Sequence, residues 1–172
     1  IAGFYTGMHL DGLLEVSEEF DTSLQFFIVK FDTDGDVLNI AEIPMEGAFL
    51  EPHTDFRYDE NLNRYYLAGF RNYGSGAYLN LSYDGTAFEN QAYILAINGT
   101  DGAEVWRKEV TSESVFDDYR IYDLEIDAES NVYIAGKYFK DSDNPVYMDG
   151  YEFPDTYTGN VLYIMRLNPA GE

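Results

Sequence analysis

The sequence contains no cysteine and few basic residues, and both shortages restrict what the chain can do. Without cysteine it has no disulfide framework, no thiolate metal site and no cysteine nucleophile. Its 10 lysines and arginines stand against 32 aspartates and glutamates, which gives a net charge of −22 at pH 7. Nucleic acid and anionic membrane surfaces need clustered positive charge, so both partners are excluded. No apolar run approaches the roughly 20 residues of a membrane-spanning helix.

Aromatic residues are abundant by contrast, with 12 Phe, 16 Tyr and one Trp among 172 residues. Such a chain buries enough apolar surface to fold, which excludes disorder. Its length predicts about one domain. The first residues, 1–5, are typical of the middle of a strand, and residues 168–172 are typical of a turn. We therefore expect the chain to be a piece of a longer protein, with any targeting segment outside it.

Two short patterns recur along the chain at one period. The first is a small apolar motif around a glycine, with spacings of 66 and 67 residues, at Gly3, Gly69 and Gly136. The second is an apolar segment closed by a turn glycine, and it occupies 26–35, 92–102 and 162–171. Both markers keep the same order, which indicates an internal repeat. We predict repeats at approximately 1–52, 53–119 and 120–172.

Each repeat has the pattern of four short strands. The third repeat shows alternating segments at 121–126 and 132–138 and an apolar segment at 161–167, and the second repeat adds a strand at 104–110. The apolar segment is hydrophobic on both faces, so we expect it to be covered on both sides by sheets stacked face to face. No segment has sustained helical periodicity. The predicted fold is all-β, with stacked four-stranded antiparallel sheets.

These residues resemble the β-propeller repeats of secreted bacterial surface proteins, including adhesin-like proteins and cargo of the type IX secretion pathway. The third repeat carries the resemblance with Asn131, Val132, Tyr133 and Gly136, followed by the ending at 167–171. The resemblance implies a β-propeller of which this chain holds about two and a half blades. It also implies an extracellular or cell-surface location, with further blades or subunits covering the open ends.

A second resemblance concerns the segment 96–106, which is similar to one repeat of the quinoprotein dehydrogenase propellers. That likeness implies an enzyme with a quinone cofactor. The family repeats its tryptophan around the ring, whereas this chain has Trp106 alone, and Asn39 stands at the matching position of the first repeat. The likeness is therefore better explained by the shared mechanics of propeller blades.

The strongest metal candidates are Asp32, Asp34 and Asp36, because calcium prefers several carboxylate oxygens on a short loop. Calcium is the cofactor that this pattern suggests. An EF-hand loop needs glycine at its sixth position and glutamate at its twelfth, and here Gly35 is fourth and Ile43 is twelfth. The alternative is a hairpin turn in which an aspartate accepts hydrogen bonds from its own backbone.

The sequence singles out no catalytic or cofactor-binding residue. With 32 acidic residues, pairs suitable for glycoside hydrolysis occur at any spacing by chance. We expect a non-enzymatic binding or assembly module with a protein or glycan partner. Two alternatives stay open, a propeller enzyme that acts on carbohydrate or uses a quinone, and a structural subunit of a surface assembly.

Overall fold

The computed structural model contains only strands as regular structure among the residues that it describes, which confirms the all-β prediction. The described residues are 2–5, 8–9, 14–15, 25–47, 55–71, 73–74, 77–78, 80–112, 118–140, 145–154 and 159–172. Within these ranges no helix is long and apolar enough to cross a membrane.

The chain divides into two compact units, which are described separately. Unit 1 comprises Ile1–Phe49 and Asn80–Ala87, and unit 2 comprises Leu50–Leu79 and Phe88–Glu172. Unit 1 holds two antiparallel three-stranded sheets and a small hairpin. The first sheet has the order β1 (Ala2–Tyr5), β4 (Gln25–Phe31), β5 (Val37–Ile43); the second has β12 (Thr86–Ala87), β11 (Leu81–Tyr83), β6 (Met45–Gly47); the hairpin is β2 (Met8–His9) with β3 (Leu14–Glu15).

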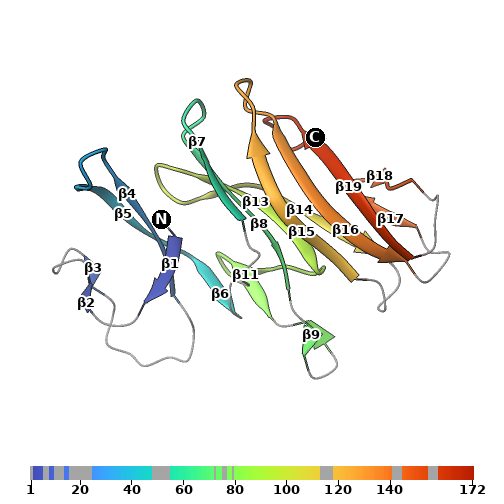
Figure 1. Ribbon diagram of the computed structural model, residues 1–172. Coiled ribbons are helices and arrows are strands. Elements are labelled where there is room, and N and C mark those ends of the chain that lie inside the picture. Colours follow the sequence, from blue (N-terminus) through green and yellow to red (C-terminus); the bar gives the residue numbers. More distant parts are fainter. Residues whose placement is uncertain are drawn as a thin grey trace. The chain divides into compact units, whose positions relative to one another are not determined.

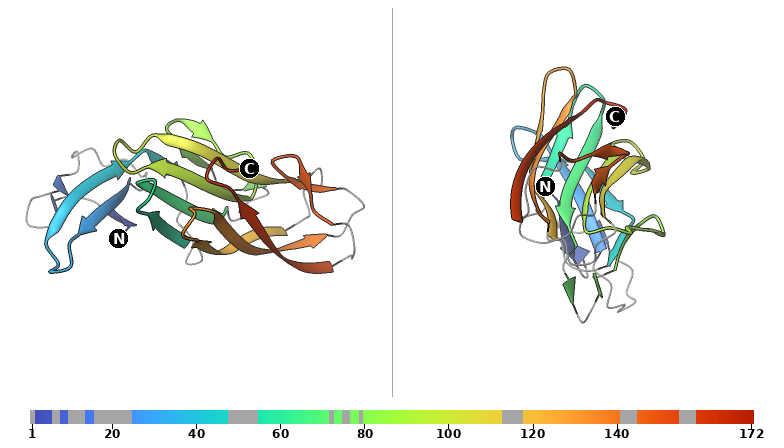
Figure 2. Two further views of the ribbon diagram at one scale, coloured as in Figure 1. Left: turned by 90° about the horizontal axis from the view of Figure 1, so that it is seen from above. Right: turned by 90° about the vertical axis from the view of Figure 1, so that its right-hand side faces the viewer.

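Unit 2 is built from two larger antiparallel sheets (Figure 1). The six-stranded sheet has the order β18 (Tyr151–Glu152), β17 (Val146–Met148), β14 (Glu104–Ser112), β13 (Ala92–Asn98), β8 (Arg64–Phe70), β7 (Asp55–Asp59). The three-stranded sheet has the order β15 (Asp118–Ile126), β16 (Val132–Lys140), β19 (Gly159–Leu167). The short strands β9 (Tyr73–Gly74) and β10 (Ala77–Tyr78) form a separate pair. The two larger sheets lie face to face as two layers (Figure 2), and one buried apolar cluster lies between them.

The pairing registers around the three repeated glycines are alike. Each repeated glycine lies opposite an aromatic residue of the next strand, in the pairs Gly3↔Phe27, Gly69↔Tyr93 and Gly136↔Tyr163. The compact units do not follow the predicted repeat boundaries, because β11 and β12 belong to the repeat 53–119 but pair with β6 in unit 1. No described sheet closes into a barrel.

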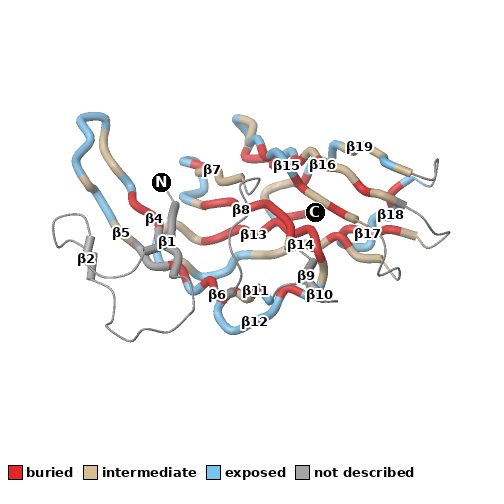
Figure 3. Tube along the Cα trace, turned by 60° about the horizontal axis from the view of Figure 1, so that its bottom comes forward, coloured by how far each residue is buried: buried red, intermediate tan, exposed pale blue. Residues whose placement is uncertain are grey.

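The structure corrects one expectation about the apolar strands. Residues 92–97 of β13 are all buried, so this strand is covered on both faces as predicted. In β19, by contrast, Leu162 is 83% exposed and Ile164 is 79% exposed. Figure 3 shows this difference along the chain trace. Coverage of both faces is therefore wrong for β19, because the chain provides no described sheet on that side of the strand.

The sequence analysis missed a repeated hairpin. The strands β11 and β12 meet at Asp84-Gly85, and β17 and β18 meet at Asp149-Gly150, 65 residues later. All four turn residues have positive φ, between 48° and 79°, as a tight two-residue hairpin requires. Each hairpin pairs with the last strand of the preceding repeat, through β11 on β6 and through β17 on β14. Each hairpin is therefore a strap between successive repeats.

Close packing explains why Gly136 is a glycine. A Cβ at this position would lie 2.2 Å from the carbonyl oxygen of Arg120 and 2.5 Å from the hydroxyl oxygen of Tyr163. The Arg120 carbonyl belongs to the neighbouring strand β15, whose register with β16 shifts at this point, between Ile121 and Asp123. A side chain would therefore push apart two strands of the sheet.

We predict that Gly136→Ala lowers the free energy of unfolding by about 1–3 kcal/mol, because overpacking a buried site forces backbone shifts. Urea unfolding followed by circular dichroism measures the change. The control is Ala135→Ser on the neighbouring, half-buried position, which we expect to change little. Equal stability of Gly136→Ala and the unaltered chain would contradict the packing account.

Candidate binding surface

In unit 2 a sheet face of the second repeat is buried against a sheet face of the third repeat. This contact shows which side chains a covered sheet face buries in this protein. Buried side chains of β8 and β13 pack against buried side chains of β15 and β16 in one cluster. From the six-stranded sheet these include Tyr66, Ala68, Phe70, Ala92, Ile94 and Ala96, and from the three-stranded sheet Ile121, Leu124, Val132, Ile134 and Tyr138. Burying one Leu or Ile side chain contributes about 1.5–3 kcal/mol, so this contact is the main source of stability in unit 2.

A polar network borders this apolar contact. Asp118, at the start of β15, accepts hydrogen bonds from Arg120 Nε at 2.8 Å and from Gln91 Nε2 at 3.1 Å. Lys137 Nζ lies 3.3 Å from the same carboxylate. Gln91 is buried, and its Oε1 accepts the backbone N–H of Tyr119 at 2.8 Å. Gln91 therefore ties the segment before β13 to β15 of the next repeat.

The pKa of Asp118 follows from these contacts. Burial raises it, but the hydrogen bond and charge of Arg120, with further bonds from Lys137 and Gln91, outweigh burial and hold the pKa below its usual value. We interpret Asp118 as a structural residue, because fixed partners already neutralise the charge of its carboxylate.

Trp106 makes a second contact between repeats. Its indole Nε1 donates to the carbonyl oxygen of Pro169 at 3.3 Å, in the last turn of the third repeat. A Cβ on Gly171 would lie 2.8 Å from the Trp106 ring, and Gly171 has a φ of +83°. The ring therefore lies flat against a turn that only glycine fits without strain.

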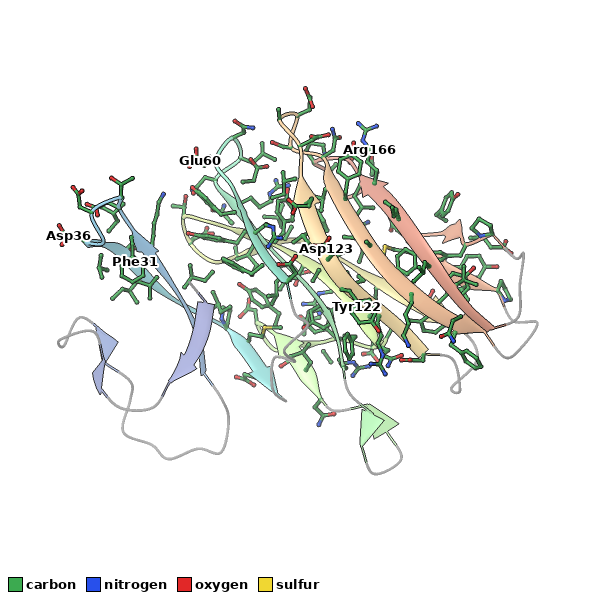
Figure 4. All side chains as sticks on the ribbon, in the orientation of Figure 1. Phe31, Asp36, Glu60, Tyr122, Asp123 and Arg166 are labelled. Atoms are coloured by element: carbon green, nitrogen blue, oxygen red, sulfur yellow. The ribbon has the colours of Figure 1, made fainter. Side chains whose placement is uncertain are left out.

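The opposite side of the three-stranded sheet is a candidate binding surface, which we call the outer face. It comprises Tyr133, Ala135 and Lys137 of β16 and, directly opposite them, Arg166, Ile164 and Leu162 of β19. Figure 4 labels Arg166 on β19 and Asp123 on β15, the strand on the other side of β16. Counting by the repeat, Leu162 and Ile164 match Ala92 and Ile94, both 0% exposed. The outer face thus repeats the positions that the second repeat buries against the third.

Charged groups bound the apolar centre of the outer face. Lys137 takes the place of Phe70, and Arg166 takes the place of Ala96. On the side of β15, Arg57 of β7 forms ion pairs with Glu125 at 3.4 Å and Asp123 at 3.9 Å. An apolar centre with a charged rim is the composition typical of a protein-binding surface.

The predicted metal site forms a turn instead of a ligand cluster. Asp32 Oδ1 accepts the backbone N–H groups of Asp34 and Asp36, each at 2.9 Å. The same arrangement occurs at Asp127 and at Asn168, where no run of aspartates is present. Among the residues that the structure describes, no three His, Cys, Asp or Glu side chains gather where they would hold a metal ion. Calcium binding by Asp32, Asp34 and Asp36 stays a prediction without a cluster to support it.

One buried carboxylate escaped the sequence analysis. Asp59, at the end of β7, is 3% exposed. Its Oδ1 accepts the N–H of Asn61 at 2.9 Å, whereas its Oδ2 has no hydrogen-bond partner among the described residues. No pattern in the sequence distinguishes Asp59 from the other acidic residues that occupy turns.

Comparison of the chain with protein-family models, with curated proteins and with solved structures finds no match. The function is therefore argued from the surfaces and contacts above.

The lowered pKa of Asp118 predicts a pH dependence of stability. Its ionised form is favoured in the folded state, so its contribution is present above the unfolded pKa of about 3.9 and is lost as the pH falls through the lower folded value. We expect Asp118→Asn to lower the Tm at pH 7, and the difference from the unaltered chain to shrink below about pH 4. Calorimetry at several pH values, with Asp34→Asn as the exposed control, measures this. A difference that is constant with pH would contradict it.

The turn interpretation of Asp32 predicts different effects for two neighbouring aspartates. Asp32→Ala removes the acceptor of two backbone N–H groups and should lower the Tm by about 2–4 °C, whereas Asp34→Ala should leave it unchanged. Thermal unfolding with and without millimolar calcium measures both effects. A calcium-dependent rise in Tm that either substitution abolishes would restore the metal site.

Proposed function

We propose that this chain is a non-enzymatic assembly and binding module, built as part of a β-propeller-type stack of sheets in an extracellular or cell-surface protein. The outer face is the observation that carries the proposal. Its apolar centre lies at repeat positions that are fully buried one repeat earlier, where they pack against the following sheet. A further sheet of the same kind, from this protein or from a partner, is the natural cover for that face.

The acidic composition supports the same role. A net charge of −22 keeps a protein with apolar sheet faces soluble and opposes indiscriminate association. Specific association then depends on a surface where apolar residues outweigh the negative charge, as Leu162 and Ile164 do beside Arg166. The surface location and the propeller closure rest on the resemblance of the repeats to those of secreted surface proteins.

The proposal predicts that the isolated chain associates through the outer face. We expect light scattering coupled to size exclusion to show a mass that rises with concentration, and Leu162→Glu with Ile164→Glu to abolish the rise. The Tm should stay within about 2 °C, because both side chains are exposed. The control is Tyr151→Glu on β18, which is 61% exposed but outside the outer face. A monomer at every concentration, unaffected by these substitutions, would contradict the proposal.

A further inference from the structure

The three-stranded sheet has an unpaired edge with a groove beside it, in addition to the outer face. Within the described part of the chain, β16 is the single strand that pairs with β19, so the other edge of β19 is free. A groove of about 570 Å³ runs beside this edge, between β19 and the β17–β18 strap. Its lining is largely apolar and includes Tyr138, Met148, Phe153, Val161, Tyr163 and Met165, together with Leu162, Ile164 and Arg166 of the outer face.

The second repeat shows what fills the corresponding place. There β14 pairs with the free edge of β13, with Arg107 opposite Leu95 and Glu109 opposite Tyr93. Tyr93 is 2% exposed and Leu95 is 0% exposed. Their counterparts in β19, Tyr163 and Met165, are only half-buried and line the groove. The groove is therefore the place of a missing strand.

The turn after β19 has the same hydrogen bonds as the turn that joins β4 to β5. Asn168 N–H donates to the Glu172 carbonyl at 2.8 Å, and Gly171 N–H donates to the Asn168 carbonyl at 2.8 Å. The same two bonds, from Asp32 to Asp36 and from Gly35 to Asp32, close the turn of the first repeat at 2.9 and 3.3 Å. After that turn, Val37 pairs with Phe31, whose counterpart is Leu167. In the first repeat the strand after this turn therefore runs antiparallel to β4, which is the register that we take for an added strand.

A contact between an arginine and a phenylalanine in the second repeat indicates which side chain an added strand should carry. In the second repeat the Arg107 guanidinium lies 4.3 Å above the centre of the Phe88 ring. Phe88 follows the first strap as Phe153 follows the second, and Phe153 lines the groove. Asp149 and Glu172 add negative charge to its lining, and Arg166 adds one positive charge. A strand with a basic residue opposite Met165 therefore meets both an aromatic ring and carboxylates.

We propose that the groove binds an extended polypeptide strand, which adds to the free edge of β19 in antiparallel register and places an arginine over Phe153. This is recognition by strand addition, in which main-chain hydrogen bonds give affinity and the groove gives specificity. The inference deepens the proposed assembly role and shares Leu162, Ile164 and Arg166 with the outer face, but its readout is protection of the β19 edge amides, whereas the proposed function is read as the mass of the isolated chain. The two proposals therefore fail separately.

The test is hydrogen exchange of the β19 amides in the 172-residue chain, with a synthetic peptide that copies Glu104–Ser112. We expect millimolar peptide to slow exchange of alternate β19 amides by about tenfold, because added ladder bonds protect every second N–H. A peptide with Arg107→Glu should protect them less. In the protein, Met165→Lys in the groove should abolish protection, whereas Tyr133→Lys, on the outer face but outside the groove lining, should preserve it.

A chain extended after Glu172 by the same nine residues provides a test that does not depend on peptide affinity. Strand addition predicts a Tm rise of about 3 °C or more and protected β19 amides, both reduced by the Arg→Glu change in the extension. Absence of protection in the peptide titration and in the extended chain overturns the proposal. So does equal protection by the Arg107→Glu peptide, or protection that persists in Met165→Lys. Protection of β19 in a dimer of the unextended chain overturns it as well, because a second copy then fills the edge.

Discussion

The packing of one apolar sheet face on another is the constraint on which unit 2 depends. The face of β8 and β13 fits the face of β15 and β16, with Ile94, Ile121 and Ile134 all 0% exposed. Sheets of this kind are stable only when such faces are covered, because each exposed face leaves large apolar side chains in water. The polar contacts of Asp118 and the indole of Trp106 lie beside this packing and link the two sheets.

The same constraint underlies the proposed function. Among the described residues no layer covers the outer face, so Leu162 and Ile164 are exposed and the edge of β19 lies open beside a groove. Elsewhere in the chain, a sheet face is covered by the following sheet, and strand edges are paired with a strap hairpin or with a fourth strand. A partner that completes the third repeat has to supply one or more of the same elements. The proposed assembly therefore extends the contacts that fold the chain.

Most of the strand content was predictable because it depends on local patterns. The repeated glycines located equivalent strands in the sequence. At Gly136 the reason is physical, because the Arg120 carbonyl comes too close to leave room for a side chain. The Asp-Gly straps were predictable in principle, because Asp84-Gly85 and Asp149-Gly150 are strong hairpin signals flanked by alternating residues. Their pairing with the preceding repeat was not, since no local pattern specifies which distant strand a short hairpin joins. The apolar pattern also predicted cover for both faces of β19, but pattern alone does not show whether the covering sheet is supplied by the same chain.

The central claim is that the two sheets of unit 2 form one cooperative stack, and native-state hydrogen exchange tests it most directly. If face-to-face packing stabilises both sheets, buried amides of β8, β13, β15 and β16 should exchange through one opening with a common free energy and a common denaturant dependence. Ile94→Ala should lower that free energy equally in both sheets, by about 2–5 kcal/mol. If β15 and β16 instead open at a separate, lower free energy that Ile94→Ala leaves unchanged, the sheets are independent and the account is contradicted.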